Sequence, residues 1–421
     1  MEASSNLFVI IIMLLFLVGS VQSRPLPDQT LDDQGHDTTH VFSLLNYGAV
    51  GDGVTDDTQA FKEAWNQVCN SSLPSPVLHV PSGKTFLLHP LDLEGPCRSA
   101  NVTVQIMGNM VAPSDPSEWQ CDYLEGSYNC PAFLTFQHMN NLYITGSEGI
   151  TIDGQGHNWW DLSCHQTTLI IRQSSNVHLR NLNIMDGPNM HIFIQASSWI
   201  YASNITISAP KSSPNTDGIH IQYSQNVFVS DSIIGTGDDC ISIGDATSFI
   251  NISRISCGPG HGISIGSLGR GGSTAAVENV HVSDVEFSGT SNGVRIKTWQ
   301  GGKGYARNIM FEKIQFYDVV YPIIIDQHYC DRHFKDSCQN SDEGSAVKVS
   351  NVTYNQVYGT SDRPTAIKFD CSETVPCTDI VVNNINIPST RRGRKTSSYC
   401  QNVYGSAHGL VIPRVPCLQY A

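Results

Sequence analysis

The chain has 421 residues and a formal net charge of −14 at pH 7, with 24 Lys and Arg against 38 Asp and Glu. A protein that binds nucleic acid needs a basic surface, so this balance argues against nucleic acid as a partner. A polyanionic ligand would also be repelled at long range, and would have to be held by a local group of cations.

The chain begins with an apolar run, Leu7–Val18, that ends at small residues. This run is shorter than the roughly 20 residues that a membrane-spanning helix needs. Val21 and Ser23 form the small-residue pattern of a cleavage site, so residues 1–23 are predicted to be a secretory signal, although no Lys or Arg precedes the run. The alternative is a retained anchor. No later segment is apolar enough to span a bilayer, so no membrane association is expected once the signal is removed.

Residues 24–40 are rich in Pro, Asp, Gln and His and predict a flexible leader, which leaves 41–421 as the folded domain. A glycine-punctuated turn over 46–53 follows. Asp56, Asp57 and Thr58 can then cap a short helix. This helix would close one end of a larger body with one apolar side, formed by Ala60, Phe61, Ala64 and Trp65.

From about Asn101 onward, the sequence returns to a short polar residue followed by alternating β-branched or aromatic residues. These segments begin at Asn141, Asn176, Asn226, Asn251, Asn279, Asn308 and Asn351. Strands this short cannot bury a face alone, so each must stack on the next. The pattern predicts an all-β fold, a right-handed single-stranded parallel β-helix. A β-sandwich is the alternative, but it favours tight hairpin turns and has no long period.

Thirteen cysteines follow the predicted signal, and they indicate an oxidising compartment because no close pair is accompanied by histidines at zinc-ligand spacing. Sequence alone does not fix the connectivity, and Cys164 is left over. The plausible local pairs are Cys69–Cys97, Cys121–Cys130, Cys240–Cys257, Cys330–Cys338, Cys371–Cys377 and Cys400–Cys417. Some of the N-glycosylation tripeptides are expected to be modified in a secreted chain, namely those at Asn70, Asn101, Asn204, Asn251 and Asn351.

Four short polar segments interrupt the strand-like sequence at a similar phase of the repeat. They are Asn-Thr-Asp at 215–217, Gly-Asp-Asp at 237–239, Gly-His-Gly at 260–262 and Arg-Ile-Lys at 295–297. A repeat converts separation along the chain into stacking in space, so these segments are expected to lie close together. Three carboxylates, one imidazole and two cations are the groups that acid/base hydrolysis of an acidic substrate requires.

The acidic segments each have a plainer interpretation. Asn215 and Asp217 stand just before a glycine and could form an ordinary turn. Asp238 and Asp239 could be solvated turn residues. Two adjacent acids directly before a buried strand are, however, suited to proton transfer if a cleft lies beside them.

The basic segments are open to two interpretations as well. His261 could be a turn histidine, but its flanking glycines allow close approach of backbone to a ligand. Arg295 and Lys297 stand two residues apart and therefore on the same face of a strand. They could form salt bridges with the nearby aspartates, or they could hold a substrate carboxylate, which arginine can grip through two parallel hydrogen bonds.

With these segments the chain resembles the polygalacturonases of glycoside hydrolase family 28, above all the plant members. The motifs stand in the family order over essentially the whole mature chain, and include 46–57, 154–156, Trp159-Trp160, 213–220, 235–239, 257–262 and 295–297. The resemblance implies a right-handed parallel β-helix, in agreement with the repeat. It also implies a secreted, cell-wall enzyme that hydrolyses the α-1,4-galacturonosidic bonds of pectin by an inverting acid/base mechanism.

By this resemblance Asp238 would be the general acid, and Asp217 and Asp239 would deprotonate the attacking water. His261 would support protonation of the acid. The substrate would be contacted by Asn215, Arg295, Lys297 and Tyr329. An inverting enzyme holds its acid and base roughly 6.5 to 9.5 Å apart to leave room for the water. No metal or other cofactor is implied, and the protein is expected to be a monomer.

One stretch departs from the pattern of many plant relatives, because Asp186-Gly187-Pro188 stands ahead of His191 in place of Asn-Ser-Pro. The departure bears on substrate preference, so decorated pectin such as xylogalacturonan or rhamnogalacturonan is an alternative substrate. A β-helical pectate lyase is another alternative, and it would need calcium-binding carboxylates and an arginine base. A non-catalytic pectin-binding protein is a third; it would have lost the catalytic set, which this chain retains.

Overall fold

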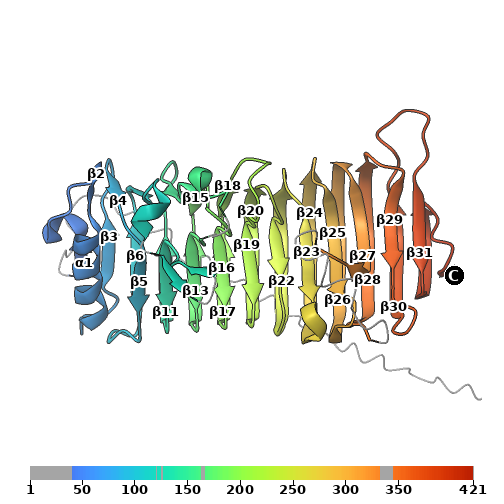
Figure 1. Ribbon diagram of the computed structural model, residues 1–421, viewed down its shortest axis with the longest axis horizontal. Coiled ribbons are helices and arrows are strands. Elements are labelled where there is room, and N and C mark those ends of the chain that lie inside the picture. Colours follow the sequence, from blue (N-terminus) through green and yellow to red (C-terminus); the bar gives the residue numbers. More distant parts are fainter. Residues whose placement is uncertain (1–39, 120, 125–126, 163–165, 332–344, 421) are drawn as a thin grey trace, which may run out of the picture. The chain divides into compact units, whose positions relative to one another are not determined.

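The computed structural model describes residues 40–119, 121–124, 127–162, 166–331 and 345–420. The predicted signal and almost all of the predicted leader lie outside the described residues. In the described body, parallel strands stack coil upon coil in chain order, from the helix α1 to the last coils around β31 (Figure 1). The right-handed parallel β-helix predicted from the repeat is confirmed.

One long sheet runs along the body and carries the polar segments of interest. Within the described residues it has eleven strands, all paired in parallel. They are β5 (Leu91–Glu94), β10 (Leu134–Gln137), β13 (Leu169–Arg172), β16 (Ile192–Gln195), β19 (Ile219–Gln222), β21 (Ile241–Ile243), β23 (Ile263–Leu268), β25 (Asn292–Trp299), β27 (Tyr321–Tyr329), β29 (Thr365–Asp370) and β31 (Ser397–Gln401).

The remaining walls of the helix are formed by a second parallel sheet, whose long strands bend around the body. Among the described residues its strands are β1 (Val41–Ser43), β2 (Asp52–Asp56), β3 (Val77–Val80), β4 (Thr85–Leu87), β6 (Val102–Ile106), β7 (Asn109–Val111), β11 (Asn140–Thr145), β12 (Ile152–Asp153), β14 (Ser175–Arg180), β15 (Asn183–Met185), β17 (Ser198–Ser203), β18 (Thr206–Ser208), β20 (Gln225–Gly235), β22 (Thr247–Cys257), β24 (Thr274–Ser288), β26 (Lys303–Val319), β28 (Lys348–Ser361), β30 (Cys377–Asn386), β32 (Val403–Ile412) and β33 (Gln419–Tyr420).

Short elements complete the described body. β8 (Asp122–Leu124) and β9 (Ser127–Asn129) form an antiparallel pair. Single 3-10 turns are η2 (Leu44–Tyr47), η3 (Pro116–Trp119), η4 (Gly156–Asn158) and η5 (Arg270–Gly272). No helix among the described residues is both long enough and apolar enough to cross a lipid bilayer.

The core fills the space inside the coils. Isoleucine and valine side chains from successive strands stack there, as Ile219, Ile241 and Ile263 do in register across β19, β21 and β23, each fully buried. Their neighbours along the strand, at alternate positions, face outward because side chains alternate between the two faces of a strand. This alternation places the polar residues of the eleven-stranded sheet on its outer face.

The helix α1 (Thr58–Asn70) closes the N-terminal end of the coils (Figure 1). The predicted apolar side is buried, together with Val68. Trp65 packs edge-on against Phe136 of β10, with ring centroids 5.6 Å apart. The capping helix is therefore confirmed, and its apolar side covers core that the first coil would otherwise expose to water.

Asp56 and Asp57 precede helix α1, and their carboxylates bind different backbone N–H groups. Asp57 occupies the N-cap position, but its carboxylate accepts the backbone N–H groups of Val50 (2.7 Å) and Gly51 (2.9 Å). The Oδ1 atom of Asp56 accepts the N–H of Thr58 (2.9 Å) instead. Capping by Asp56 is confirmed, whereas Asp57 ties the preceding turn to the helix.

Asparagines at the repeat corners stack between coils. Most of those predicted to open a repeat take a left-handed conformation, which asparagine tolerates well. Asn176 Nδ2 donates to Asn141 Oδ1 (2.6 Å), and Asn351 Nδ2 donates to Asn308 Oδ1 (2.9 Å). These ladders satisfy the side-chain amides and explain why the repeat begins with this residue type.

The repeat beginning predicted at Asn251 is wrong. Val227 of β20 pairs with Ile250 of β22, so the residue opposite Asn226 is Phe249. Phe249 takes the left-handed conformation there, with φ 57°. Asn251 lies two residues further along β22, where it pairs with Phe228. In the sequence it looks like a corner asparagine, but it does not occupy the corner.

Five of the predicted disulfides are present: Cys69–Cys97, Cys121–Cys130, Cys240–Cys257, Cys371–Cys377 and Cys400–Cys417. Cys338 of the predicted pair Cys330–Cys338 lies outside the described residues, and Cys164 lies outside them as well. Most of the bridges join segments close in sequence, as the local pairing predicted.

Candidate active site

The four polar segments meet on the outer face of the eleven-stranded sheet. Asp217 and Asp239 lie just before β19 and β21, and His261 lies just before β23. Arg295 and Lys297 project from β25, where the strand places them on one face. Because β19, β21, β23 and β25 are consecutive neighbours in parallel pairing, the segments stack side by side.

Asp239 is held by both cations. Its Oδ1 atom accepts a hydrogen bond from Arg295 Nη2 at 2.8 Å, and its Oδ2 atom accepts one from Lys297 Nζ at 3.1 Å. The carboxylate side chain is only 2% exposed. Burial alone would raise the pKa of Asp239, but Lys297 and Arg295 outweigh it and lower the pKa to about 2. Asp239 is therefore ionised at any pH at which the protein would work.

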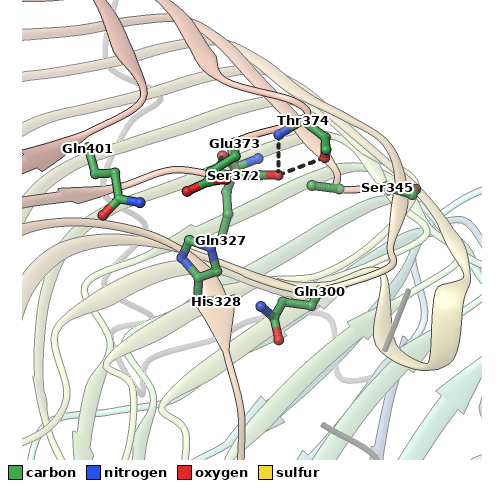
Figure 2. Close-up of a pocket in the computed structure, with 9 residues that line it drawn as sticks. Gln300, Gln327, His328, Ser345, Ser372, Glu373, Thr374 and Gln401 are labelled. Atoms are coloured by element: carbon green, nitrogen blue, oxygen red, sulfur yellow. Dashed lines mark hydrogen bonds between the residues drawn. The ribbon is translucent and has the colours of Figure 1, made fainter. Parts of the chain in front are cut away.

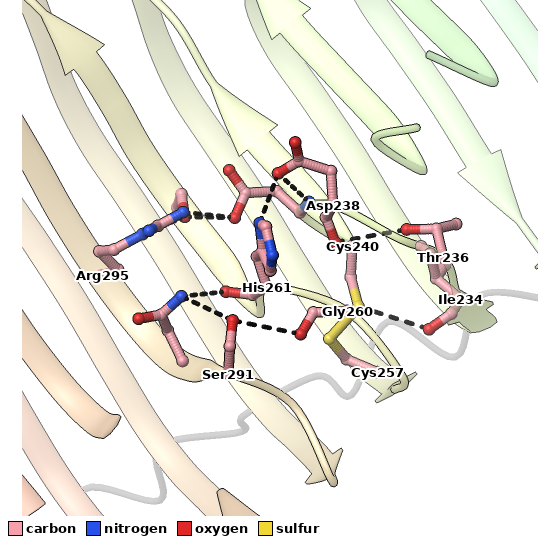
Figure 3. Close-up of a disulfide and its surroundings, with 12 residues drawn as sticks. Ile234, Thr236, Asp238, Cys240, Cys257, Gly260, His261, Ser291 and Arg295 are labelled. Atoms are coloured by element: carbon pink, nitrogen blue, oxygen red, sulfur yellow. Dashed lines mark hydrogen bonds and ion pairs between the residues drawn. A yellow bond between two sulfur atoms is a disulfide. The ribbon is translucent and has the colours of Figure 1, made fainter. Parts of the chain in front are cut away.

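Asp238 and His261 form a second pair nearer to solvent (Figure 3). His261 Nδ1 lies 2.8 Å from Asp238 Oδ1, and the backbone N–H of His261 donates to the Asp238 carbonyl oxygen at 2.7 Å. The two side chains are 22% and 43% exposed respectively, so a ligand can reach both. The imidazole faces the aspartate that directly precedes Asp239, so the two carboxylates have different partners.

Asp217 accepts a short hydrogen bond, at 2.5 Å, from Ser242 Oγ to its Oδ2 atom. Burial raises the pKa of Asp217 well above its usual value, and the negative charges of Asp238 and Asp239 raise it further. Its environment is thus the opposite of that of Asp239, although the two residues stand on neighbouring strands. Two carboxylates with separated proton affinities are the arrangement expected where proton transfer takes place.

A buried histidine fixes the backbone under Asp217. The N–H and the Nδ1 atom of His191 approach the Asp217 carbonyl oxygen at 2.9 and 3.1 Å, and Gly187 N donates to His191 Nε2 at 3.1 Å. Burial lowers the pKa of His191 to about 4, so the ring is neutral and carries its proton on Nδ1. The stretch that departs from the plant pattern, 186–188, therefore supports the turn of Asp217.

Hydrogen bonds of Thr216 join the turn over 215–217 to the turn over 237–239. Thr216 Oγ1 accepts the backbone N–H of Gly237 at 3.1 Å and donates to Ser213 O at 3.1 Å. A Cβ atom on Gly237 would stand 1.9 Å from Ser213 O, so only glycine fits this close approach. The turn that carries Asp238 is thereby locked against the turn that carries Asp217.

The disulfide Cys240–Cys257 fastens the next two segments (Figure 3). It joins the residue after Asp239 to the turn that leads into His261. That turn is also held by Asn292 Nδ2, which donates to the His261 carbonyl oxygen at 3.1 Å. The polar groups are thus fixed by the scaffold before any ligand arrives.

The two remaining predicted contact residues differ in their placement. Tyr329 lies at the end of β27, with its ring centroid 5.4 Å from Lys297 Nζ and 5.5 Å from the ring of Trp299. Asn215 is exposed and left-handed, with φ 54°. Within the described residues, no hydrogen bond joins its side chain to the other members of the site.

Sequence reasoning missed several residues that hold the carboxylates. Ser264 Oγ donates to Asp239 Oδ1 at 2.7 Å and accepts Arg295 Nε at 2.9 Å. Ser242 Oγ likewise donates to Asp217 Oδ2, and His220 Nδ1 lies 2.6 Å from Ser242 Oγ. The available signal was register: these residues are the outward-facing polar positions of β19, β21 and β23, at the level of Arg295.

A pocket of about 240 Å³ lies at the C-terminal ends of β25, β27 and β29 (Figure 2). It is lined by the ends of neighbouring coils: Gln300, Gln327, His328, Ser345, Ala346, Ser372, Glu373, Thr374 and Gln401. Gln327 is fully buried, and its amide is fixed by Val347 O and by the N–H of Ser372. The lining is mostly uncharged amide and hydroxyl groups.

Among the described residues, two clusters of carboxylate and imidazole groups have the composition of a metal site. In one, Asp326, His328 and Asp370 approach one another within 4.8 Å, but Lys368 Nζ lies 3.1 Å from Asp370 and 3.7 Å from Asp326. An ammonium group thus already supplies the positive charge. The other cluster consists of Asp238, Asp239 and His261. There Arg295 and Lys297 of β25 supply the positive charge, since both pair with Asp239.

Comparison with known proteins agrees with the fold and the motifs. The model of glycosyl hydrolases family 28 matches residues 69–409. A polygalacturonase of Persea americana is 42% identical over 396 residues, covering 92% of this chain and 79% of that protein. Polygalacturonase-2 of Solanum lycopersicum is 42% identical over 389 residues, covering 90% of this chain and 81% of that protein. The chain belongs to glycosyl hydrolases family 28.

Solved structures share the architecture. A polygalacturonase from Erwinia carotovora superposes with a TM-score of 0.69 at 23% identity, covering 89% of this chain and 98% of that one. An endo-xylogalacturonan hydrolase from Aspergillus tubingensis superposes with a TM-score of 0.71 at 22% identity, covering 90% and 98%. At this level of identity the likeness concerns the fold.

Proposed function

We propose that this protein is a polygalacturonase, which hydrolyses the α-1,4-galacturonosidic bonds of homogalacturonan by an inverting acid/base mechanism. The observation that carries the proposal is the placement of Arg295 and Lys297 directly beside Asp239, with Asp238 and Asp217 on neighbouring turns. In a strongly acidic chain, such a local pair of cations is suited to the carboxylate of a galacturonate unit.

Each group has a role in this proposal. Asp238 donates a proton to the glycosidic oxygen, because its side chain is 22% exposed, against 2% for Asp239, and has His261 as a partner. Asp239, which is ionised, and Asp217 take the proton of the attacking water. Arg295 and Lys297 bind the sugar carboxylate next to the cleaved bond. Asn215 and Tyr329 contact the sugar rings, as the family resemblance implies.

Binding of the substrate carboxylate also has a chemical consequence for the base. A carboxylate with a pKa of about 2 is a weak base. When a substrate carboxylate shares Arg295 and Lys297 with Asp239, its negative charge offsets part of theirs and the proton affinity of Asp239 rises. The substrate would thus strengthen the base that acts on it, and only an acidic sugar unit would do so.

The test is to incubate the protein with de-esterified homogalacturonan and to separate the products by size over time. Saturated oligomers or galacturonate are expected, and their anomeric configuration, followed by NMR, should be inverted at first release. A ladder of oligomers would indicate cutting within the chain, and galacturonate alone from the start would indicate attack at the ends. Products with an unsaturated, ultraviolet-absorbing end would contradict hydrolysis and point to a lyase.

The pocket at the ends of β25, β27 and β29 bears on the alternative substrate, decorated pectin. Its uncharged amide and hydroxyl lining could accept a neutral branch sugar next to the main chain. Xylogalacturonan and rhamnogalacturonan should therefore be tested beside homogalacturonan. A higher kcat/KM on either than on homogalacturonan would replace the main proposal, and no product from any of the three would favour a pectin-binding protein without activity.

The same proposal places the enzyme outside the cell, in the cell wall. Five disulfides need an oxidising compartment to form and persist. Removal of residues 1–23 as a secretory signal, and action as a monomer, remain part of the proposal. Mass spectrometry of the secreted protein would reveal its first residue and any glycans, and light scattering would give its oligomeric state.

A further inference from the structure

A row of polar side chains crosses the active-site strands at a single register position. It consists of His220 on β19, Ser242 on β21, Ser264 on β23 and Arg295 on β25. Each serine donates its hydroxyl proton to one carboxylate, Ser242 to Asp217 and Ser264 to Asp239. The row thus contains two parallel hydrogen-bond chains.

The two chains end in different groups. Behind Ser264 stands Arg295, whose Nε–H donates to Ser264 Oγ at 2.9 Å. Behind Ser242 stands His220, whose Nδ1 lies 2.6 Å from Ser242 Oγ. Arginine is permanently charged, whereas burial lowers the pKa of His220 and so favours its neutral ring. The carboxylate of Asp239 is therefore supported by charge, and that of Asp217 by a neutral chain.

The proton count fixes the direction of the neutral chain. Ser242 has one hydroxyl proton, and it points to Asp217 Oδ2. The Ser242 oxygen must then accept a proton from His220, so the imidazole carries its hydrogen on Nδ1. The other ring nitrogen, Nε2, lies 3.3 Å from Gln222 Oε1, and turning the Gln222 amide over brings its NH2 group to the unprotonated Nε2. The chain His220 to Ser242 to Asp217 therefore donates toward the carboxylate.

Other groups around His220 do not replace this contact. Phe193 of β16 packs on the ring with centroids 5.0 Å apart and provides an apolar wall. The charges that act on the imidazole are Asp239 and Lys297, which have opposite signs. For Asp217, in contrast, the Ser242 hydrogen bond is the first influence that opposes burial and the two neighbouring acids.

We propose that His220 is a positioning residue of the reaction: acting through Ser242, it orients Asp217 and favours its ionised, water-activating form. This rests on the proposed function, because Asp217 acts as a base only there. Hydrogen bonds to a charged group favour the charged form, and a buried carboxylate without them would hold its proton. His220 thereby does for Asp217 what the cations do for Asp239, with no charge of its own.

The test compares the pH dependence of kcat/KM for the native enzyme, His220→Leu, His220→Asn and Ser242→Ala on de-esterified homogalacturonan. Loss of the hydrogen bond that holds Ser242 toward the Asp217 carboxylate predicts roughly a 10-fold fall in kcat for His220→Leu and a shift of the acidic limb to higher pH by about half to one unit. KM should change by less than about twofold, because His220 does not touch the substrate. His220→Asn, which can place an N–H where Nδ1 stood, should recover most of the rate and the native limb.

Controls separate positioning from general loosening of the fold. His178→Leu removes a half-buried histidine that stacks between Tyr143 and Tyr201 on the other sheet, and its pH profile should stay native. If His220→Leu does not fold, as judged by circular dichroism, Ser242→Ala carries the same test because it deletes only one hydroxyl. An unshifted limb in the folded variant, or an equal shift in His178→Leu, overturns the proposal. A native enzyme without activity would instead overturn the proposed function.

Discussion

Arg295 and Asp239, which stand on neighbouring parts of the site but are 56 residues apart in the chain, are joined by a 2.8 Å ion pair in the absence of substrate. The salt bridge considered as an alternative to substrate binding is therefore present. It does not exclude binding, because the guanidinium has five N–H donors and its contacts with Asp239 and Ser264 use two of them. The same cations can set the charge of the base and hold the sugar.

This double role predicts the behaviour of Lys297→Met. Lys297 lowers the pKa of Asp239, so its removal should raise that pKa from about 2. The acidic limb of kcat/KM, which requires the ionised base, should then move to higher pH. KM for homogalacturonan should also rise, by roughly 10-fold or more, since a charge-assisted contact with the substrate is lost.

The matched control for this variant is Lys348→Met, an exposed lysine on β28 of the other sheet. It removes the same charge and should leave KM and the pH profile unchanged. A rise of KM in both variants would mean that net charge, and not the position of Lys297, attracts the polyanion.

Replacement of the proposed general acid should separate catalysis from binding. Asp238→Asn keeps the size of the side chain but cannot donate a proton to the glycosidic oxygen, so kcat should fall by roughly 10²- to 10⁴-fold. The affinity for oligogalacturonate, measured by calorimetry, should stay within a few-fold of native. Asp231→Asn removes an exposed aspartate that pairs with Arg254, and it should keep full activity. Activity of Asp238→Asn near the native level would remove this residue from the mechanism.

Much of the arrangement of the active-site residues was predictable, because the period of the repeat determines which residues of successive coils lie side by side. Three of the polar segments recur at one phase of the coil, because Asp217, Asp239 and His261 each stand two residues before an isoleucine of the same register row, and Arg295 lies three residues further along, level with Ser264. Their assembly on one sheet follows from the β-helix itself. Asp217 and Asp239 could be recognised since each precedes a buried strand and stands next to glycine-containing turns. The stacked asparagines at the corners, such as Asn176 on Asn141, follow from the same period.

The supporting residues were not predictable from one sequence. Ser242, Ser264 and His220 look like ordinary outward-facing polar positions of alternating strands, and only the register shows which carboxylate each one meets. The corner opposite Asn226 is occupied by Phe249, and Asn251 stands two residues after it, so the sequence pattern pointed to the wrong residue. A side chain whose partner is one coil away leaves no local pattern.

The turn at Gly237 predicts a strict requirement for glycine. In Gly237→Ala, the new Cβ atom would stand 1.9 Å from Ser213 O, which is backbone and cannot rotate away. The turns of Asp217 and Asp238 should separate, with a loss of activity and a lower melting temperature. Gly149→Ala, where no atom lies within 4 Å of the added Cβ, should cost only the strain of its left-handed φ of 75°, about 1 kcal/mol. Equal melting temperatures for the two variants would contradict this steric account.

Asp239 and Asp217 should have opposite effects on stability. The pKa of Asp239 is lowered from its usual 3.8 to about 2, so its ion pairs stabilise the fold fully above about pH 4 and this stability is lost as the pH falls toward 2. The pKa of Asp217 is raised, so the folded protein keeps a proton that the unfolded chain releases near pH 4. Stability is therefore lost as the pH rises from about 4 through the folded pKa of Asp217.

At pH 7, Asp217→Asn should thus melt above the native protein, by about 1 to 3 °C, although its activity is lost. Asp239→Asn should melt below it, because Arg295 and Lys297, which are 14% and 11% exposed, lose the carboxylate that balances their charge. At pH 3 the gain in Asp217→Asn should disappear, since Asp217 is then protonated in both the folded and the unfolded chain. Melting curves between pH 3 and pH 7 would check this, and a lower melting temperature for Asp217→Asn at pH 7 would show that its ionised form is the stable one in the fold.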